Sequence, residues 1–525
     1  MFYLKKRDGF ARIGHIELKS FKIETPCIVE LGSEFVRKLD FGKAAYPVKY
    51  FCEEVYEKLK STEKDIRILT GLSALGPRNL VNVFSEVGNF RPLYAVAAAT
   101  PYTVPILIYL GVDILDNILA ISKACEGIYF LNEGEVELSK LKELPCNCEV
   151  CRKYGIDLKD LDFREKCEAL AKHNTRILRN IVEFCKILIE KEELRNYVEA
   201  RAKLKPDLTV ILRLSESLDD SLFSRFKKST CYFNTLESFS RFEVRYFLNR
   251  ALECYAPECD VVLILPCTAK KPYLTSKTHR KIRESVKIGV NEIIVSSPLV
   301  VPREFELVYP AVNYDTPVTG HWSNEEIDFV ASWLRKFIEK GKFEKVVAHV
   351  EGGYKKVVER ALKDYEVVYT AEDGILSSQS LERLKREVEG QSYRLYEHIF
   401  EHMFRYQFGC VVAGRVRGRY PKIELFNRSV VSRVDLNYGM LDIYRDVAEK
   451  FVKEKIYSVK IDDFEPSTTI FAAGVIDACE NIRPNDVVVF YNNEIFGVGL
   501  AVMSGREMVE CEKGVAVKVR RKWRF

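Results

Sequence analysis

Residues 260–279 read DVVLILPCTAKKPYLTSKTH, and this stretch decides the fold expected for the middle of the chain. Residues 260–265 form an apolar run with the length and β-branched content of a buried strand. The strand is expected to stop at Pro266 and to open into a loop with six reactive side chains: Cys267, Lys270, Lys271, Tyr273, Ser276 and His279. Ligand sites form at strand ends in open α/β sheets, so this loop is the first candidate site.

Similar apolar segments flank the motif and alternate with helical stretches. They are 207–214 (DLTVILRL), 292–298 (EIIVSSP) and 345–353 (KVVAHVEGG). This order predicts an α/β sandwich over residues 206–375, in which all of these segments are buried parallel strands. The last segment ends in Glu351-Gly352-Gly353 and is expected to open a helix whose amide end could hold an anion.

The composition limits the function classes. A chain of 525 residues is too long for one core, so three or four domains are expected. The net charge is +5, which means that a nucleic-acid surface must be local. Fifteen cysteines in a long chain without a signal peptide indicate a reducing cytoplasm with metal-binding or catalytic thiols. Residues 93–112 are uncharged, but Pro101 and Pro105 favour a buried strand and helix over a membrane span.

A metal site is predicted near residue 150. Cys146, Cys148 and Cys151 lie in PCNCEVC, and His173 follows on a helix expected over residues 163–191. Three thiolates and an imidazole complete the tetrahedral set that zinc prefers, so these residues predict a structural zinc site rather than a catalytic one. The alternative is four unrelated residues.

The chemistry of the central loop follows from its residue types. Lys270 and Lys271 place positive charge beside Cys267, which favours a nucleophilic thiolate. His279 is a candidate proton shuttle. The alternatives are a buried structural Cys267, a solvated Lys270, and Ser276 as the N-cap of a helix that starts near residue 277.

Two basic segments are candidate nucleic-acid contacts. Residues 409–426 predict a hairpin in which Arg415, Arg417 and Arg419 share one face of a strand. The chain ends in VKVRRKWRF, with five more cations: Lys518, Arg520, Arg521, Lys522 and Arg524. Both segments are expected to bind RNA phosphates; merely solubilising charge is the alternative for each.

The spacing PC-x-x-x-KPY-x-x-S-x-x-H, from Pro266 to His279, resembles the signature of the archaeosine synthase family. These archaeal enzymes modify a 7-cyano-7-deazaguanine already present in tRNA. The cysteine cluster with His173-Asn174, the Thr25-Pro26 pair and residues 111–116 (GVDILD) resemble tRNA-guanine transglycosylases. Asp116 matches their nucleophile, but no DSGG motif is present, and a helix-cap or polar-packing role is the alternative.

The resemblances imply a multidomain α/β chain. Residues 1–205 would be a transglycosylase-like domain, with a shortened TIM-barrel-like fold and a zinc site, because a complete barrel takes about 250 residues. Residues 206–375 would be the α/β core, 376–447 a small α+β connecting domain, and 448–525 a PUA pseudo-barrel. Residues 466–503 carry the PUA resemblance, in FAAGV, RPND and FGVG.

The family resemblance also implies a reaction. Nitrogen from lysine or glutamine would be added to the nitrile at position 15, in the D-arm of tRNA, and a lysine product would require a radical S-adenosylmethionine partner. Catalysis is expected from Cys267, Lys271 and His279. Substrate contacts are expected from Tyr273, Ser276, Asp315 and His321, with Tyr273 and Trp322 flanking the base. A second copy of the chain is a further candidate partner. The alternatives are a working transglycosylase and a non-catalytic tRNA-binding subunit.

Overall fold

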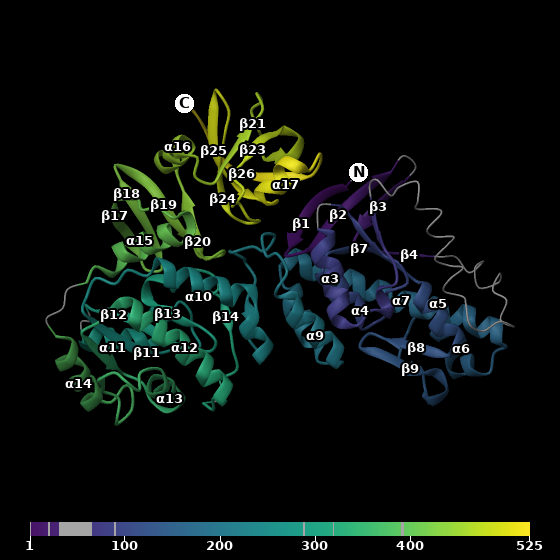
Figure 1. Cartoon of the computed structure of the whole chain (residues 1–525), viewed down its shortest axis with the longest axis horizontal. Helices are drawn as coiled ribbons and strands as arrows, with labels where there is room; N and C mark the ends of the chain where they lie inside the picture. Colours follow the sequence, from purple (N-terminus) through teal and green to yellow (C-terminus); the bar gives the residue numbers. More distant parts are fainter. Residues whose placement is uncertain are drawn as a thin grey trace. The chain divides into compact units, whose positions relative to one another are not determined.

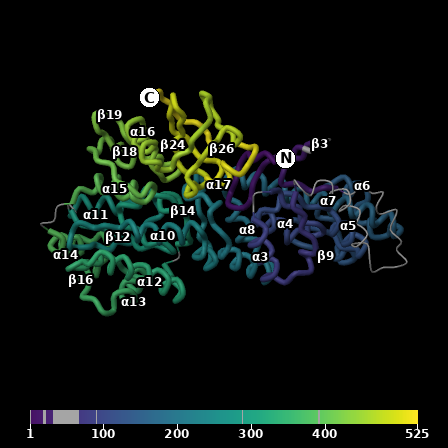
Figure 2. Tube along the Cα trace, turned by 45° about the horizontal axis from the view of Figure 1, so that its top comes forward, coloured from purple at the N-terminus to yellow at the C-terminus, as the bar shows by residue number. Residues whose placement is uncertain are grey.

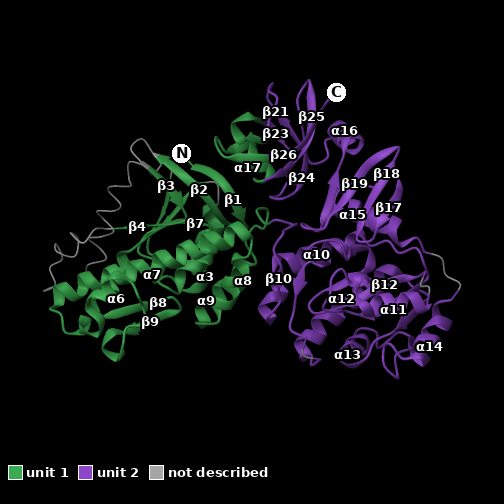
Figure 3. Cartoon of the chain, turned by 180° about the vertical axis from the view of Figure 1, so that it is seen from behind, with its two compact units in different colours: residues 1–223, 469–475, 502–517 green, residues 224–468, 476–501, 518–525 purple. Residues whose placement is uncertain are grey.

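The computed structural model describes residues 2–18, 21–30, 66–88, 91–286, 289–318, 320–389 and 393–525. The chain divides into two compact units (Figures 1 and 3). Unit 1 comprises Met1–Phe223, Thr469–Val475 and Val502–Val517, and unit 2 comprises Ser224–Thr468, Ile476–Ala501 and Lys518–Phe525.

Unit 1 is built on a four-stranded parallel sheet with the order β4-β7-β6-β5. The strands are β4 (Cys27–Val29), β7 (Val112–Asp116), β6 (Leu93–Ala95) and β5 (Arg67–Leu69). The helices around it include α3 (Pro77–Val87), α4 (Thr103–Tyr109), α5 (Ile118–Cys125) and α7 (Phe163–Lys191). Within the described residues the parallel sheet has fewer strands than the eight of a complete barrel, as the shortened-barrel prediction required.

Two predictions of secondary structure in unit 1 are confirmed. The apolar segment 93–112 folds as β6 and the buried helix α4. Helix α7 begins after Asp162, whose carboxylate accepts from the amides of Arg164 and Glu165, and its Cys167 and Cys185 lie in the core. Among the described residues, no helix has the length and hydropathy needed to cross a membrane.

The core of unit 2 is a five-stranded sheet with the order β13-β12-β11-β15-β16. Strands β11 (Val261–Pro266), β12 (Asn291–Val295), β15 (Lys345–Ala348) and β16 (Val367–Tyr369) are parallel, whereas β13 (Val300–Pro302) is an antiparallel edge. One face packs against α11 (Lys277–Val286) and α14 (Ser378–Val388), where Leu263, Leu265, Ile282 and Leu384 belong to one buried hydrophobic cluster. Helices α10 (Phe242–Cys254) and α12 (Asn324–Gly341) lie in unit 2 together with this sheet (Figure 2).

The strand predicted at 207–214 is wrong, because this segment is helix α9 (Pro206–Ser215) in unit 1. Its buried residues are Leu208, Ile211, Leu212 and Ser215, which have the i, i+3, i+4, i+7 spacing of a helical face, while Val210 is exposed. Pro206 at the first turn also suits a helix start. The other three predicted strands are β11, β12 and β15.

The strand order creates a topological switch point. The chain leaves β11 for β12 on one side, and later places β15 on the other side of β11. In open parallel sheets a crevice forms at such a point, outside the carboxyl ends of the two central strands. Here these ends carry the motif loop and the start of α13 (Gly352–Ala361).

The rest of unit 2 contains a second sheet and further helices. After α15 (Leu395–Phe408) comes the antiparallel sheet β17-β18-β19-β20, formed by β17 (Arg415–Arg419), β18 (Lys422–Asn427), β19 (Ser429–Asp435) and β20 (Met440–Ile443). The predicted hairpin is β17 and β18. Helix α16 (Arg445–Glu454) and strands β21 (Ser458–Ile461), β24 (Val487–Tyr491) and β25 (Ile495–Ala501) follow.

Candidate functional site

A thiol lies at the switch point. Cys267 directly follows β11, and its amide donates to the carbonyl of Val295 on β12 at 3.0 Å, which fixes the backbone of the loop. Its Sγ is 3.2 Å from the hydroxyl of Tyr354, in the first turn of α13 after β15. Two strand ends that are adjacent in the sheet therefore place a half-buried thiol beside a half-buried phenol.

The ring of Tyr354 is held by an aromatic neighbour. Trp322 packs edge-on against it, with ring centroids 5.2 Å apart and an interplanar angle of 69°. The indole also lies against Gly353, where a Cβ atom would be 2.2 Å from Trp322 Cδ1. Glycine is therefore required at this position if Trp322 is to hold the tyrosine.

Lys271 contributes a partly desolvated ammonium group. Its Nζ lies 4.0 Å from the centroid of the Tyr314 ring, a cation–π contact. Burial lowers the pKa of Lys271, and the nearby Cys267 and Asp315 partly oppose this effect. Tyr314 is itself fixed, because its hydroxyl bonds to those of Tyr273, at 2.5 Å, and Ser296.

The second half of the motif faces the protein interior. Tyr273 is fully buried, so its ring has no face open to a base in this structure. Ser276 accepts from the amide of His279 at 3.2 Å and thereby caps α11, which is the alternative that its position left open. The sequence-based roles of both residues in substrate binding remain predictions, and the geometry gives each of them a packing role.

His279 is fully buried and bonded at both ring nitrogens. Nε2 is 2.9 Å from the carbonyl oxygen of Pro266, to which it donates, and Nδ1 accepts from Arg303 Nη2 at 2.7 Å. Burial and the charge of Arg303 hold the pKa of His279 well below its usual value. Both nitrogens are occupied, so neither is free to take a proton from the thiol in this structure.

The two remaining substrate candidates, Asp315 and His321, are exposed. Asp315 is exposed and accepts from the amide of Thr316 at 2.9 Å. His321 and Trp322 line a surface hollow of about 670 Å³ with residues of α12 and α13. Cys267, Lys271, Tyr314 and Tyr354 are neighbours and make up the candidate reactive group. Tyr314 and Tyr354 are the members that the sequence-based reasoning missed.

Unit 1 contains the predicted metal cluster. The ligand atoms of Cys146, Cys148, Cys151 and His173 all lie within 4.8 Å of one another. The Nδ1 atom of His173 is 3.5 Å from Cys148 Sγ and 3.4 Å from Cys151 Sγ. A tetrahedral ion with ordinary Zn–S and Zn–N bonds places sulfur and nitrogen about 3.6 Å apart, so these residues fit such an ion.

The residues around the cluster orient the His173 ring and keep it neutral. His173 Nε2 donates to the carbonyl of Phe130 at 2.9 Å, which leaves Nδ1 facing the sulfur atoms. Tyr129 stacks on the His173 ring at 3.8 Å, and its hydroxyl is 3.2 Å from Cys151 Sγ. Burial lowers the pKa of His173 to about 4, so the imidazole is in its neutral, metal-binding form at pH 7.

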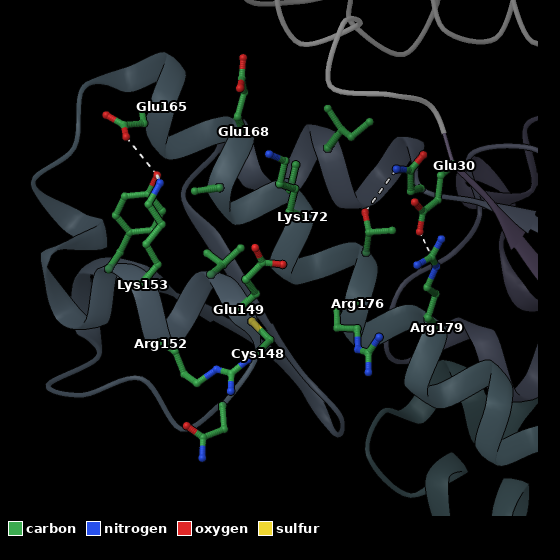
Figure 4. Close-up of a pocket in the computed structure, with 18 residues that line it drawn as sticks. Glu30, Cys148, Glu149, Arg152, Lys153, Glu165, Glu168, Lys172, Arg176 and Arg179 are labelled. Carbon is green, nitrogen blue, oxygen red and sulfur yellow. Dashed lines mark hydrogen bonds and ion pairs between the residues drawn. The ribbon is translucent and has the colours of Figure 1, made fainter.

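A pocket of about 750 Å³ adjoins this cluster (Figure 4). Cys148 and residues of α6 (Glu149–Tyr154) and α7 line it. Its charged residues have both signs: Arg152, Lys153, Lys172, Arg176 and Arg179, against Glu30, Glu149, Glu165 and Glu168. Arg179 is paired with Glu30, so part of the positive charge is already neutralised.

Asp116, at the end of β7, is buried and has several donors. Its Oδ2 accepts from the hydroxyl of Tyr94 at 2.8 Å and the amide of Ala97 at 2.9 Å, and its Oδ1 from the amide of Ile118 at 3.0 Å. Burial nevertheless raises the pKa of the carboxyl group. This is the polar-packing and helix-start role that was the alternative to a nucleophile.

The two basic segments differ in how far their charges are already paired. Arg415, Arg417 and Arg419 are exposed on β17, and no carboxylate pairs with any of the three among the described residues. Arg417 lies over the Phe426 ring at 3.4 Å. In the terminal strand, by contrast, cations are paired: Arg520 with Asp435 and Asp442, Arg521 with Asp442, and Lys522 and Arg524 with Glu465.

Four family profiles match successive segments of this chain. Profiles described as queuine tRNA-ribosyltransferase, a domain of unknown function, a pre-PUA domain and a PUA domain match residues 53–207, 244–388, 393–452 and 466–523. The residues of the reactive group lie in the second match.

Relatives cover most of the chain. Archaeosine synthase subunit alpha of Methanosarcina acetivorans is 37% identical over 87% of this chain and 80% of its own length. Archaeosine synthase of Haloferax volcanii is 34% identical over 99% and 98%. The tRNA-guanine(15) transglycosylase of Methanothermobacter thermautotrophicus is 26% identical over 83% and 67%. The chain belongs to the archaeosine synthase family.

Proposed function

We propose that this chain is a tRNA-modifying transferase of archaeosine biosynthesis. It adds an amino-acid-derived nitrogen to the nitrile of 7-cyano-7-deazaguanine at position 15 of tRNA. The observation that carries this proposal is the half-buried Cys267 thiol at the switch point, 3.2 Å from Tyr354 and near Lys271, in a chain of this family.

The reaction is covalent catalysis in two steps. The sulfur of Cys267 adds to the nitrile carbon and forms a thioimidate; the donor amine then attacks the same carbon, the C–S bond breaks, and an amidine remains. Lys271 supplies positive charge beside the nitrogen that becomes negative in the first step. The amine attacks in its neutral form, which a partly dry site favours.

Two donors fit this chemistry. Lysine would be transferred whole and its product then cleaved by a radical S-adenosylmethionine partner, whereas glutamine would supply ammonia. Base exchange is less well supported, because the Asp116 carboxylate is buried and accepts three hydrogen bonds. A binding subunit without activity would leave the arrangement of Cys267 and Tyr354 without a purpose.

Zinc and tRNA complete the proposal. Cys146, Cys148, Cys151 and His173 would hold a structural zinc ion, which would fix the loop before α6 to α7. In unit 2, Arg415 and Arg419 would bind tRNA phosphates, in agreement with the PUA match to residues 466–523.

The test is the intact mass of tRNA that carries the cyano base, after incubation with the purified chain and lysine or glutamine. A gain of one whole lysine would establish transfer to the nitrile and require a cleaving partner. A gain of ammonia from glutamine would make the chain an amidotransferase. An unchanged mass with both donors would refute the reaction and favour a binding subunit.

A further inference from the structure

We propose, on the basis of the function above, that Tyr354 is a catalytic residue. Its hydroxyl orients the sulfur of Cys267 and donates the proton that the nitrile nitrogen gains when the sulfur adds to the carbon.

The geometry of Tyr354 carries this inference. Its hydroxyl is 3.2 Å from Cys267 Sγ, which is hydrogen-bond distance for a sulfur acceptor. The phenol comes from α13 after β15 and the thiol from the end of β11, so the contact crosses the switch point where a ligand would enter. Trp322 and the Cβ-free Gly353 fix the ring, which makes the contact a feature of the fold rather than of one rotamer.

Other proton donors near the sulfur are less suitable. Both ring nitrogens of His279 are bonded, to Pro266 and Arg303. The ammonium of Lys271 lies over the Tyr314 ring, and the carbonyl of Ala269 is 3.5 Å from its Nζ. Among the described residues, the hydroxyl group that is hydrogen-bonded to the Cys267 thiol is that of Tyr354.

The proton and electron balance closes without a redox partner. The thiolate forms a C–S bond, one electron pair of the C≡N bond moves to nitrogen, and that nitrogen takes the proton of the Tyr354 hydroxyl. The donor amine then adds to the same carbon and loses one proton to the tyrosinate. The C–S bond breaks and the thiolate leaves with its electron pair, so both residues return to their starting state.

The resting phenol is suited to this exchange. Burial and the adjacent Cys267 raise the pKa of Tyr354, so its proton stays in place until a stronger base appears. The nitrogen anion formed by addition to a nitrile is such a base. Positioned proton transfer of this kind contributes about 10²–10⁴-fold to rate.

The experiment compares Tyr354→Phe with the wild-type chain. The variant removes one hydroxyl and keeps the ring against Trp322. The rate of the covalent protein–tRNA adduct is measured by mass with cyano-base tRNA and no donor amine, together with the tRNA Kd, the melting midpoint and the alkylation of Cys267 by iodoacetamide. Tyr365→Phe makes the same chemical change at an exposed tyrosine of the same domain and serves as the control.

The expected result is an adduct rate about 100-fold lower in Tyr354→Phe. Its tRNA Kd, melting midpoint and alkylation should remain near those of the wild-type chain and of Tyr365→Phe. A wild-type adduct rate in Tyr354→Phe would overturn the inference and leave the proposed function standing. A slower rate that is explained by weaker tRNA binding or by a lower melting midpoint would do the same. A wild-type chain that forms neither adduct nor amidine would overturn both proposals.

Discussion

Replacement of His279 separates a proton shuttle from a structural residue. His279→Ala leaves the carbonyl of Pro266 and one N–H of Arg303 buried without partners. Each unsatisfied group costs about 1–3 kcal/mol, and more when it is charged, so a loss of roughly 3–6 kcal/mol is expected. Domains are stable by about 5–15 kcal/mol, so this variant should melt well below the wild-type chain.

His279→Gln is the informative partner variant. The glutamine amide can donate to the carbonyl of Pro266 and accept from Arg303, so this variant should retain most of the stability. Its turnover should lie within about fivefold of the wild-type value, because no general acid–base group is lost. Thermal unfolding and single-turnover formation of modified tRNA measure the two properties. A Gln variant that melts like the wild type but turns over at least about 100-fold more slowly would refute this reasoning and restore His279 as the shuttle.

Three further outcomes are expected. Cys148→Ser should reduce the amount of bound zinc, measured by metal analysis, and the stability of unit 1, measured by thermal unfolding. Cys267 should still be alkylated at the wild-type rate, because the cluster and the thiol lie in different units. Arg415→Gln and Arg419→Gln should each lower the salt slope of tRNA binding by about 1, whereas Lys522→Gln, whose charge is already paired with Glu465, should change it less. Burial lowers the pKa of His279 and His349, so below about pH 6.5 the unfolded chain binds protons that the native chain does not. The free energy of unfolding, measured in urea, should therefore fall with pH by up to about 1.4 kcal/mol per pH unit for each group. A flat profile from pH 7.5 to about 5.5 would contradict this.

The sequence predicts those features that depend on local pattern. The predicted apolar runs form β11, β12 and β15, and the helix expected over 163–191 is α7. The strand predicted for segment 207–214 is wrong because a short run rich in Leu, Val and Ile suits a strand as well as a buried helix face. The spacing of Leu208, Ile211 and Leu212, with Pro206 before them, was the signal for α9.

The contacts of the site depend on strand order, which the sequence pattern does not contain. Tyr354 meets Cys267 because β15 pairs with β11, and Arg303 meets His279 because β13 turns back beside β12. The sequence predicts a possible anion site at the Glu351-Gly352-Gly353 strand exit. Tyr354, the next residue, would have followed from it only if β11 and β15 had been known to be neighbours.

A cluster of buried charged residues explains why the motif from Pro266 to His279 contains residues other than those proposed to react. Arg303, Glu292 and Glu306 form a fully desolvated cluster, which would be costly if its polar groups were not bonded to one another. The cluster also holds both ends of the reactive loop. His279 links it to the carbonyl of Pro266, and Glu306 accepts from the amide of Leu274 at 3.3 Å.

A loop fixed at both ends keeps its side chains in place without help from substrate. Catalytic groups act best when the protein sets their geometry beforehand, since little reorganisation is then left for the reaction itself. Cys267 and Lys271 lie between the two anchored points, whereas Tyr273, Ser276 and His279 face inward and hold them. In the proposed reaction, the spacing from Pro266 to His279 therefore combines two reactive residues with the residues that position them. Loss of an inward-facing residue should then slow the reaction by displacing the thiol rather than by removing a proton carrier.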